Sequence, residues 1–235
     1  MSSQSDLGSL DTNGQGKWQL AGVRWLLPAG WLLAALGFFG PWIAHPTAAL
    51  SLSGSDMAEF VKFLPAFLDG SLRLLRQLFY LPPFAVAVSI ALLIGLDSLR
   101  YSRFVRAVAL LLAVPVSLQL LPPAWSPASL IGSEFRAQTL ALGVCWLLLA
   151  CFWLYERLPA WLLGSVSAVL CLLAIFLPGW QFVTAKPAID EVYSMPLSPG
   201  WGIVLCFIGL AIVALGSTIL ALSTRSQRIG RRASA

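Results

Sequence analysis

The stretch FFGPWIAHP, residues 38–46, closes the first long apolar run of the sequence and predicts where its first helix stops. Glycine and proline end helices, and tryptophan favours the headgroup level of a membrane. Two later apolar runs end in a similar way, in LPPAWSP at 121–127 and in LPGWQF at 177–182. We interpret the repeated ending as one shared membrane boundary, because the unequal spacing of the tryptophans argues against duplicated hairpins.

The composition is that of a polytopic membrane protein. Of the 235 residues, 58% are hydrophobic and 11% are charged, whereas soluble domains carry roughly a quarter charged residues. A helix needs about 20 apolar residues to cross a bilayer. The sequence therefore predicts an all-α fold with six transmembrane helices near 25–43, 82–97, 104–121, 137–154, 159–177 and 201–222.

These helices are expected to form one domain, 17–224, between a disordered tail at 1–16 and a basic tail at 225–235. Lysine and arginine are enriched on the cytoplasmic side of membrane proteins. The basic segments SLRYSRFVR at 98–106 and STRSQRIGRR at 223–232 lie beside helix ends. We therefore predict a multi-pass protein of the plasma membrane with both termini in the cytoplasm. The basic segments contain no motif for nucleic-acid binding, so no such partner is predicted. This orientation puts the predicted boundary tryptophans at the outer interface, namely Trp42, Trp125, Trp180 and Trp201.

The first outer loop contains an amphipathic segment at 57–79, with apolar residues on one helical side and charges on the other. Pro65 and Gly70 interrupt it, so one kinked helix or two short ones in the outer interface plane are expected. Asp69 and Arg73 have the spacing of an ion pair on a helix. We interpret the segment as a connector resting on lipid, with a docking surface or a lid as the alternative.

The second outer loop follows the fifth helix and carries the adjacent carboxylates Asp190 and Glu191. Two carboxylates without further oxygen donors at suitable spacing are a weak cation signal. We interpret the pair as part of a solvated turn, and we predict no metal site.

The six predicted spans contain no aspartate, glutamate, lysine, arginine or histidine except Asp97 and Arg106, which lie at the predicted cytoplasmic ends of the second and third spans. Proton-coupled transporters, charge-gated channels and intramembrane aspartyl proteases need such groups at membrane depth. The serines within the spans have no intramembrane base to activate them, and the four cysteines lie in apolar surroundings, where they act as small apolar residues. We predict no catalytic residue, no cofactor and no enzymatic activity.

His45, the only histidine, is a possible haem or pigment ligand or proton relay, but without a second ligand it is better interpreted as a polar boundary residue.

Small residues recur at helix-packing intervals in the last two spans. They let helix backbones approach closely, either within the bundle or against another subunit. The residues concerned are Gly164, Ala168, Gly202, Gly209 and Gly216. Near the outer ends of the third and fourth spans, Gln119 and Gln138 are expected to hydrogen-bond to one another or to a ligand.

Two functions remain open. The first is a non-enzymatic accessory, scaffold or assembly subunit of a larger membrane complex, whose partners are the bilayer and other membrane subunits or a second copy of the chain. The second is a small-molecule transport component, because the predicted layout resembles the substrate-capture subunits of energy-coupling-factor vitamin transporters. Gly30 and Ala34 partly match the alanine-spaced docking motif of that family. The resemblance implies an outward-facing cavity for a polar ligand, lined by Trp42, Gln119, Gln138 and Trp180.

Overall fold

The computed structural model describes the backbone of residues 5–44, 51–122 and 125–233, and the side chains of 20–44, 51–122, 125–155 and 157–226. The longer helices are α1 (Ser5–Phe39), α4 (Leu81–Leu93), α5 (Arg103–Leu118), α7 (Arg136–Ala150), α8 (Ala160–Tyr193) and α9 (Trp201–Ala233). The short helices are α2 (Gly54–Phe60), α3 (Pro65–Leu68) and α6 (Pro127–Ile131). Single 3-10 turns are η2 (Val61–Phe63), η3 (Arg76–Tyr80), η4 (Asp97–Leu99) and η5 (Phe152–Arg157).

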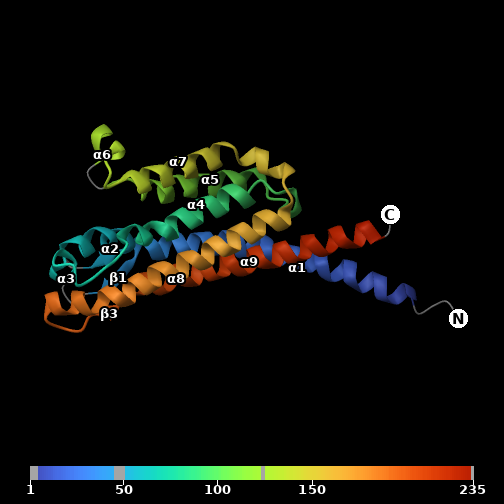
Figure 1. Cartoon of the computed structure of the whole chain (residues 1–235). Helices are drawn as coiled ribbons and strands as arrows, with labels where there is room; N and C mark the ends of the chain where they lie inside the picture. The colour runs from blue at the N-terminus through green and yellow to red at the C-terminus, as the bar shows by residue number, and fades with distance from the viewer. Residues whose placement is uncertain (1–4, 45–50, 123–124, 234–235) are drawn as a thin grey trace.

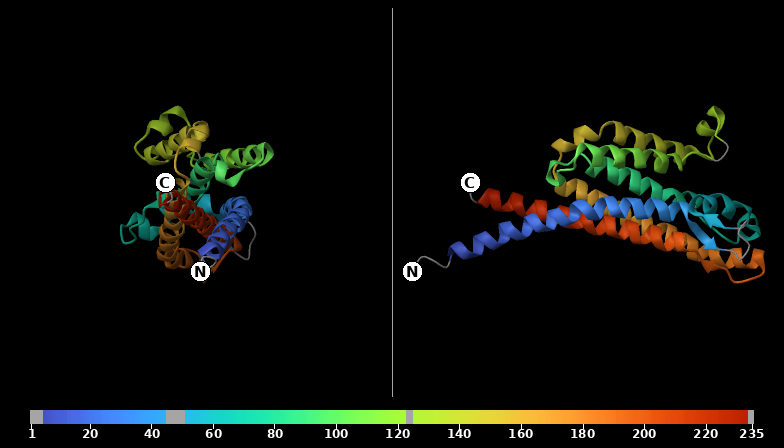
Figure 2. Two further views of the ribbon diagram at one scale, coloured as in Figure 1. Left: turned by 90° about the vertical axis from the view of Figure 1, so that its right-hand side faces the viewer. Right: turned by 180° about the vertical axis from the view of Figure 1, so that it is seen from behind.

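The long helices form two layers joined by α4 (Figure 1). α1, α8 and α9 lie side by side as long rods, with α9 packed along both of its neighbours. α4 contacts α8 on one side and the pair α5 and α7 on the other, so this pair lies apart from the three long helices (Figure 2). The described ends of α1 and α9 lie at one end of the bundle, opposite α2, α3 and α6.

Four helical stretches are long and apolar enough to cross a membrane. They are Leu20–Phe39, Arg76–Leu93, Ala160–Tyr193 and Trp201–Ser226. The prediction of an all-α membrane protein is thereby confirmed, but the predicted number of six spans is not. α5 has 16 residues and α7 has 15, which gives them lengths of about 24 and 22 Å at a rise of about 1.5 Å per residue. The hydrocarbon core of a bilayer is about 30 Å thick.

Helix α1 ends at Phe39, four residues before the predicted end at 43. Pro41 has no N–H to donate to the carbonyl of Gly37, four residues earlier, as the next helical turn would require. The indole Nε1 of Trp42 donates to that carbonyl instead, at 3.3 Å. The GPW sequence therefore ends the helix and also provides the side chain that satisfies the broken turn.

The chain after α1 enters a small antiparallel sheet that the all-α prediction did not include. Strand β1 (Pro41–Ala44) lies between β2 (Leu52–Ser53) and β3 (Ser198–Pro199). Gly200 donates its N–H to the carbonyl of Trp42 at 2.8 Å, and a Cβ at Gly200 would overlap the Pro41 carbonyl. The sheet thus joins the two predicted outer loops.

Helix α8 does not stop at LPGW as predicted. It runs from Ala160 through Pro178 and Pro187 to Tyr193. Proline removes one helical hydrogen bond but is tolerated in helices of membrane proteins, where neighbouring groups compensate for it. The predicted loop therefore begins only after Tyr193, where Ser194 adopts a left-handed conformation with φ of 53°.

The correction to α8 also changes the setting of Asp190, which lies in a helix instead of a solvated turn. Lys186 forms an ion pair with it, with Nζ and Oδ2 2.5 Å apart. The backbone N–H of Leu197 donates to the same carboxylate at 3.0 Å. These partners hold the end of α8 against the segment that leads to β3.

The segment 57–79 is broken into short pieces, in the order α2, η2, α3 and η3. Its buried side chains, Met57, Ala58, Val61 and Leu64, join the hydrophobic core. The apolar side therefore packs in part against the bundle, not only on lipid. The expected pairing of Asp69 with Arg73 is wrong. The Asp69 carboxylate instead accepts from the N–H of Ser71 at 2.8 Å, and hydrogen bonds from Ser71 hold the pKa of Asp69 below its usual value.

Both predicted tails are helical in their described parts. α1 begins at Ser5, inside the stretch 1–16 predicted to be disordered, and α9 continues to Ala233. Extending an existing helix fixes one residue for each hydrogen bond gained, so it is far easier than starting a new one.

Candidate functional site

The ligand residues proposed from the sequence do not meet in one cavity. Trp42 is fully buried instead of lying at an interface. Its ring makes edge-to-face contacts with Phe38, Phe79, Phe182 and Phe207, with ring centroids 6.1, 6.2, 6.3 and 5.8 Å apart. Such contacts each stabilise by about 0.5–1.5 kcal/mol beyond the burial of area. Trp42 is therefore the centre of an aromatic core, formed where α1, α8 and α9 meet the outer segment.

The other predicted residues lie elsewhere. Trp180 projects from α8 with 73% of its surface exposed, and Trp125 and Trp201 are also exposed. Gln119 caps the end of α5 and is half-buried, whereas Gln138 is buried on α7. His45 lies outside the described residues, so its predicted role has no structural description.

The predicted small residues of α9 pack against α1. A Cβ added at Gly209 would overlap the backbone nitrogen of Ala34 and lie 2.7 Å from the carbonyl oxygen of Gly30. One at Gly202 would lie 2.5 Å from the carbonyl carbon of Gly40. Farther along α9, one at Gly216 would lie 3.2 Å from Leu27. Gly30 and Ala34, the partial match to a docking motif, are thus already occupied by α9.

The small residues of α8 face α9. A Cβ at Gly164 would lie 2.7 Å from the carbonyl oxygen of Ser217. Ser167 and Ser217 share a buried hydrogen bond of 3.1 Å, and Ala168 is buried. All five predicted packing residues therefore lie within the described bundle.

An ion-pair network around the buried Arg76, the Arg76 cluster, joins η3 to α2 and to the segment before α7. Arg76 is 8% exposed. Its Nη1 lies 3.2 Å from Oε1 of Glu59 and its Nη2 lies 2.8 Å from Oε1 of Glu134. Lys62 binds the other oxygen of Glu59 at 2.5 Å, and the Tyr80 hydroxyl donates to Glu59 at 3.3 Å.

The charges of the Arg76 cluster balance, with two carboxylates against one guanidinium and one ammonium. A buried charge is tolerated when it is paired and hydrogen-bonded. The Arg76 guanidinium also lies over the ring of Phe135, with Cζ 5.3 Å from the centroid. The cluster therefore has the features of a structural clamp. Sequence reasoning missed it because Glu59 and Glu134 lie 17 and 58 residues from Arg76, beyond any local spacing rule.

A small cavity adjoins this clamp and contains the buried amide of Gln138. The cavity has a volume of about 150 Å³ and is lined by Gln77, Tyr80, Leu81, Phe84, Leu120, Ala137, Gln138 and Ala141. Gln138 is 3% exposed. Its amide interacts with the Tyr80 hydroxyl, but neither its Nε2 nor its Oε1 forms a hydrogen bond of good geometry in the described part of the chain. Buried polar atoms are normally paired. The Gln138 amide can therefore bind a ligand that carries a hydrogen-bond donor next to an acceptor, because Oε1 would accept from the donor and Nε2 would donate to the acceptor.

A broad apolar surface, the α5–α7 face, covers the outer side of the helix pair α5 and α7. The opposite side of α5 is buried, as the buried side chains of Ala109 and Ala113 show. α5 and α7 both pack on α4. Trp146 of α7 donates its indole N–H to Oγ of Ser117 of α5 at 3.2 Å, which ties the two helices together. The exposed side chains of the face are Phe104, Val108, Leu111, Val114 and Leu118 of α5, with Leu140, Val144, Trp146 and Leu147 of α7.

Together these features define an all-α membrane protein with a densely packed three-helix layer and a peripheral pair of shorter helices. Comparison with known proteins found no matching family model, curated protein or solved structure. Among the described residues, no group of three or more histidine, cysteine, aspartate or glutamate side chains is placed to hold a metal ion.

Proposed function

We propose that the chain is a non-enzymatic accessory or scaffold subunit of the plasma membrane, with both termini cytoplasmic, which binds another integral membrane protein through the α5–α7 face. The observation that carries the proposal is the length of α5 and α7. They are apolar on their exposed sides, yet their 16 and 15 residues fall short of the bilayer core.

A hydrophobic helix that is too short for its membrane thins the bilayer, draws flanking residues toward the interface, or associates with other helices. Association also buries exposed side chains by van der Waals packing, which drives helix contacts in lipid. The glycine-lined surfaces of α1, α8 and α9 are already filled by one another. This leaves the α5–α7 face as the free helix-packing surface that best fits a partner.

The test is site-specific crosslinking in native membranes. A photoreactive side chain is placed at Leu111 or Leu147 on the α5–α7 face, and at Val183 of α8 or Val204 of α9 as exposed controls. We expect positions 111 and 147 to form adducts with one defined membrane protein in near-stoichiometric yield, and positions 183 and 204 to react with lipid only. Equal protein adducts from both sets, or lipid adducts alone from all four, would overturn the proposal.

A second candidate function, capture of a small polar molecule for transport, is favoured by the Gln138 cavity. A site built to hydrogen-bond a ligand strongly rejects analogues that lack the matching group, because its own polar atoms are then left unpaired. The cavity of about 150 Å³ is smaller than typical ligand pockets of about 300–1,000 Å³. It therefore suits a carboxylic acid or a primary amide of few atoms.

Mass spectrometry of molecules released from the purified chain tests this second function. Wild-type protein and the Gln119→Leu control are expected to release the same small polar compound, whereas Gln138→Leu releases none. All three proteins should unfold at similar temperatures. Absence of any such compound from wild type would sink the capture function and leave the scaffold proposal untouched.

A further inference from the structure

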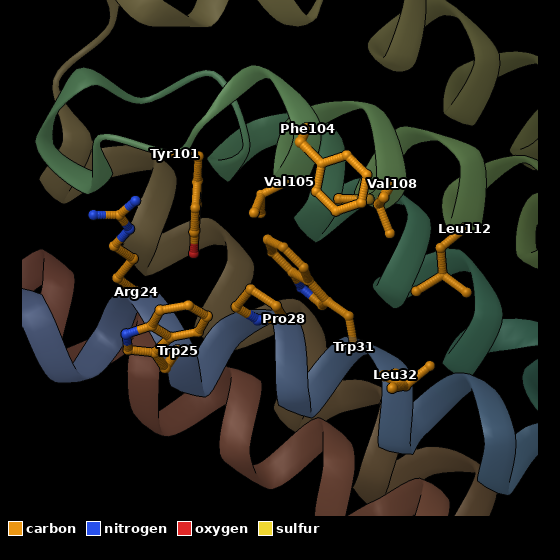
Figure 3. Close-up of a pocket in the computed structure, with 11 residues that line it drawn as sticks. Arg24, Trp25, Pro28, Trp31, Leu32, Tyr101, Phe104, Val105, Val108 and Leu112 are labelled. Atoms are coloured by element: carbon orange, nitrogen blue, oxygen red, sulfur yellow. The ribbon is translucent and has the colours of Figure 1, made fainter.

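A second cavity, the α1–α5 cavity, lies between α1 and the first turns of α5 (Figure 3). The turn from α4 into α5 lies at the end of the bundle nearer the termini (Figure 1). Its volume is about 220 Å³. Arg24 is the charged residue among those that line it, and the remainder are apolar or aromatic. They are Trp25, Pro28, Trp31, Leu32, Tyr101, Phe104, Val105, Val108, Ala109 and Leu112.

Two hydrogen-bond donors in the wall of this cavity have no acceptor. Trp31 is 1% exposed and Tyr101 is 6% exposed, and neither Nε1 of Trp31 nor the Tyr101 hydroxyl has a partner in the described part of the chain. In Figure 3 the Tyr101 hydroxyl is turned toward α1, and the Trp31 ring stands between α1 and α5. Leaving a buried donor unpaired costs about 1–3 kcal/mol. Acceptor oxygens of a ligand would remove this cost.

The titration state of Tyr101 keeps it in the donor role. Burial raises the pKa of Tyr101 above its ordinary value, and the nearby Arg24 acts weakly in the opposite direction. The hydroxyl therefore stays protonated at neutral pH. The indole N–H of Trp31 donates only, so both groups call for the same kind of ligand atom, an acceptor oxygen.

The charges on the cavity wall and on the segment that leads into α5 favour an anion. Arg24 lines the cavity, and Arg100, Arg103 and Arg106 lie on the segment that enters α5, with Asp97 the opposing charge on η4. Basic residues near a membrane surface attract anionic lipid by about 1 kcal/mol each. The walls deeper in the cavity are aliphatic and aromatic, and they suit a hydrocarbon chain.

We propose that the α1–α5 cavity binds one acyl chain of an anionic phospholipid from the leaflet on the side of the chain termini, with the lipid phosphate at Arg24. The ester and phosphate oxygens accept from Trp31 and Tyr101. The bound lipid fills the space between α1 and α5 and so fastens the peripheral helix pair to the long-helix layer. The cavity shares Phe104 and Val108 with the edge of the α5–α7 face, but lipid binding in it does not depend on any partner protein.

Native mass spectrometry of the full chain in mild detergent tests the site, with phosphatidylglycerol or phosphatidylcholine of identical acyl chains as the probe. The expected result is one retained phosphatidylglycerol, bound about fivefold more tightly than phosphatidylcholine. Arg24→Gln should abolish this preference. The exposed Arg157→Gln on η5, which does not line the cavity, is the charge control and should keep it.

A second pair of variants tests the cavity itself. Val108→Trp places a large ring in the cavity from a position that is 48% exposed, and Val114→Trp makes the same change on α5 at a position that is 44% exposed and does not line the cavity. Val108→Trp is expected to lower retention of both lipids at least severalfold, whereas Val114→Trp leaves retention unchanged. Equal retention of the two lipids by wild type, or full retention by Val108→Trp, would overturn the proposal. Matching thermal unfolding of the two tryptophan variants separates loss of binding from loss of fold.

Discussion

At the scale of single residues, Trp42 shows how a local helix ending and a long-range core depend on one side chain. Its indole N–H satisfies the Gly37 carbonyl that Pro41 leaves without a partner. The same ring contacts phenylalanines from α1, η3, α8 and α9. A residue that closes a helix locally therefore also fixes where four elements meet.

We expect Trp42→Phe to lower the free energy of unfolding by about 1–3 kcal/mol, because the buried Gly37 carbonyl loses its donor. The measurement is thermal or chemical unfolding of the purified protein in detergent. Trp180→Phe, at an exposed tryptophan of α8, is the matched control and should change stability by less than about 0.5 kcal/mol. Equal effects of the two changes would contradict the assigned role of Trp42.

At the scale of elements, the crossing of α1 over α9 depends on glycine. Close backbone approach leaves no room for side chains at Gly30, Gly37 and Gly209. Van der Waals packing of such surfaces is a main source of helix association in lipid. The crossing also explains why these small residues are not available to another subunit.

Gly209→Ala is expected to destabilise the protein by about 1–3 kcal/mol, since the new methyl group overlaps the backbone of α1 and forces the helices apart. Gly143→Ala is the control, because nothing lies within 4 Å of a Cβ at that position of α7. Alanine is favoured over glycine inside a helix by about 1 kcal/mol, so this change should be neutral or stabilising. Unfolding midpoints in detergent distinguish the two, and a neutral Gly209→Ala would refute the close crossing.

The Arg76 cluster is the element-scale link between the segment after β2 and the helix pair α5 and α7. We expect Arg76→Leu to cost about 1–3 kcal/mol, because it removes the buried guanidinium that hydrogen-bonds to both Glu59 and Glu134. Arg73→Leu removes an exposed arginine from the same segment and should have little effect. Unfolding free energies of both variants provide the measurement. A small cost for Arg76→Leu would mean that the carboxylates of the cluster are solvated.

At the scale of the whole molecule, the two layers have different degrees of packing. α1 and α8 are long helices packed along α9, whereas α5 and α7 rest mainly on α4 and expose large apolar side chains. The described ends of the chain lie at one end of the bundle and α6 at the other (Figure 1). This polarity makes the proposed orientation in the membrane testable.

In intact cells, cysteines placed at Ser71 and at Ser129 of α6 are expected to react with a membrane-impermeant maleimide. A cysteine at Ser226 should react only after permeabilisation, because positively charged segments favour the cytoplasmic side. The four native cysteines, of which Cys151 is the one not fully buried, are first replaced by alanine. Labelling of position 226 without permeabilisation would reverse the proposed orientation.

Much of the architecture was predictable because its causes are local or compositional. The starts of α4 and α5 follow from local signals. Prolines open α4, and the Ser102 side chain accepts from the N–H of Val105 at the first turn of α5. The candidate sites were predicted less well. Gln138 was proposed as a ligand residue, but its cavity depends on Tyr80 and Leu120 from other elements, and the α1–α5 cavity had no sequence signal.

By itself the sequence determined that this is an all-α membrane protein, because a chain with 58% hydrophobic and 11% charged residues has too much apolar surface to hide from water. Only the tertiary structure decided that Trp42 is core and not interface, that α8 continues past Pro178, and that Glu59 and Glu134 share Arg76. The physical reason is the same in each case. A local pattern fixes what a residue prefers, but the partners that satisfy or override that preference come from segments far away in the chain.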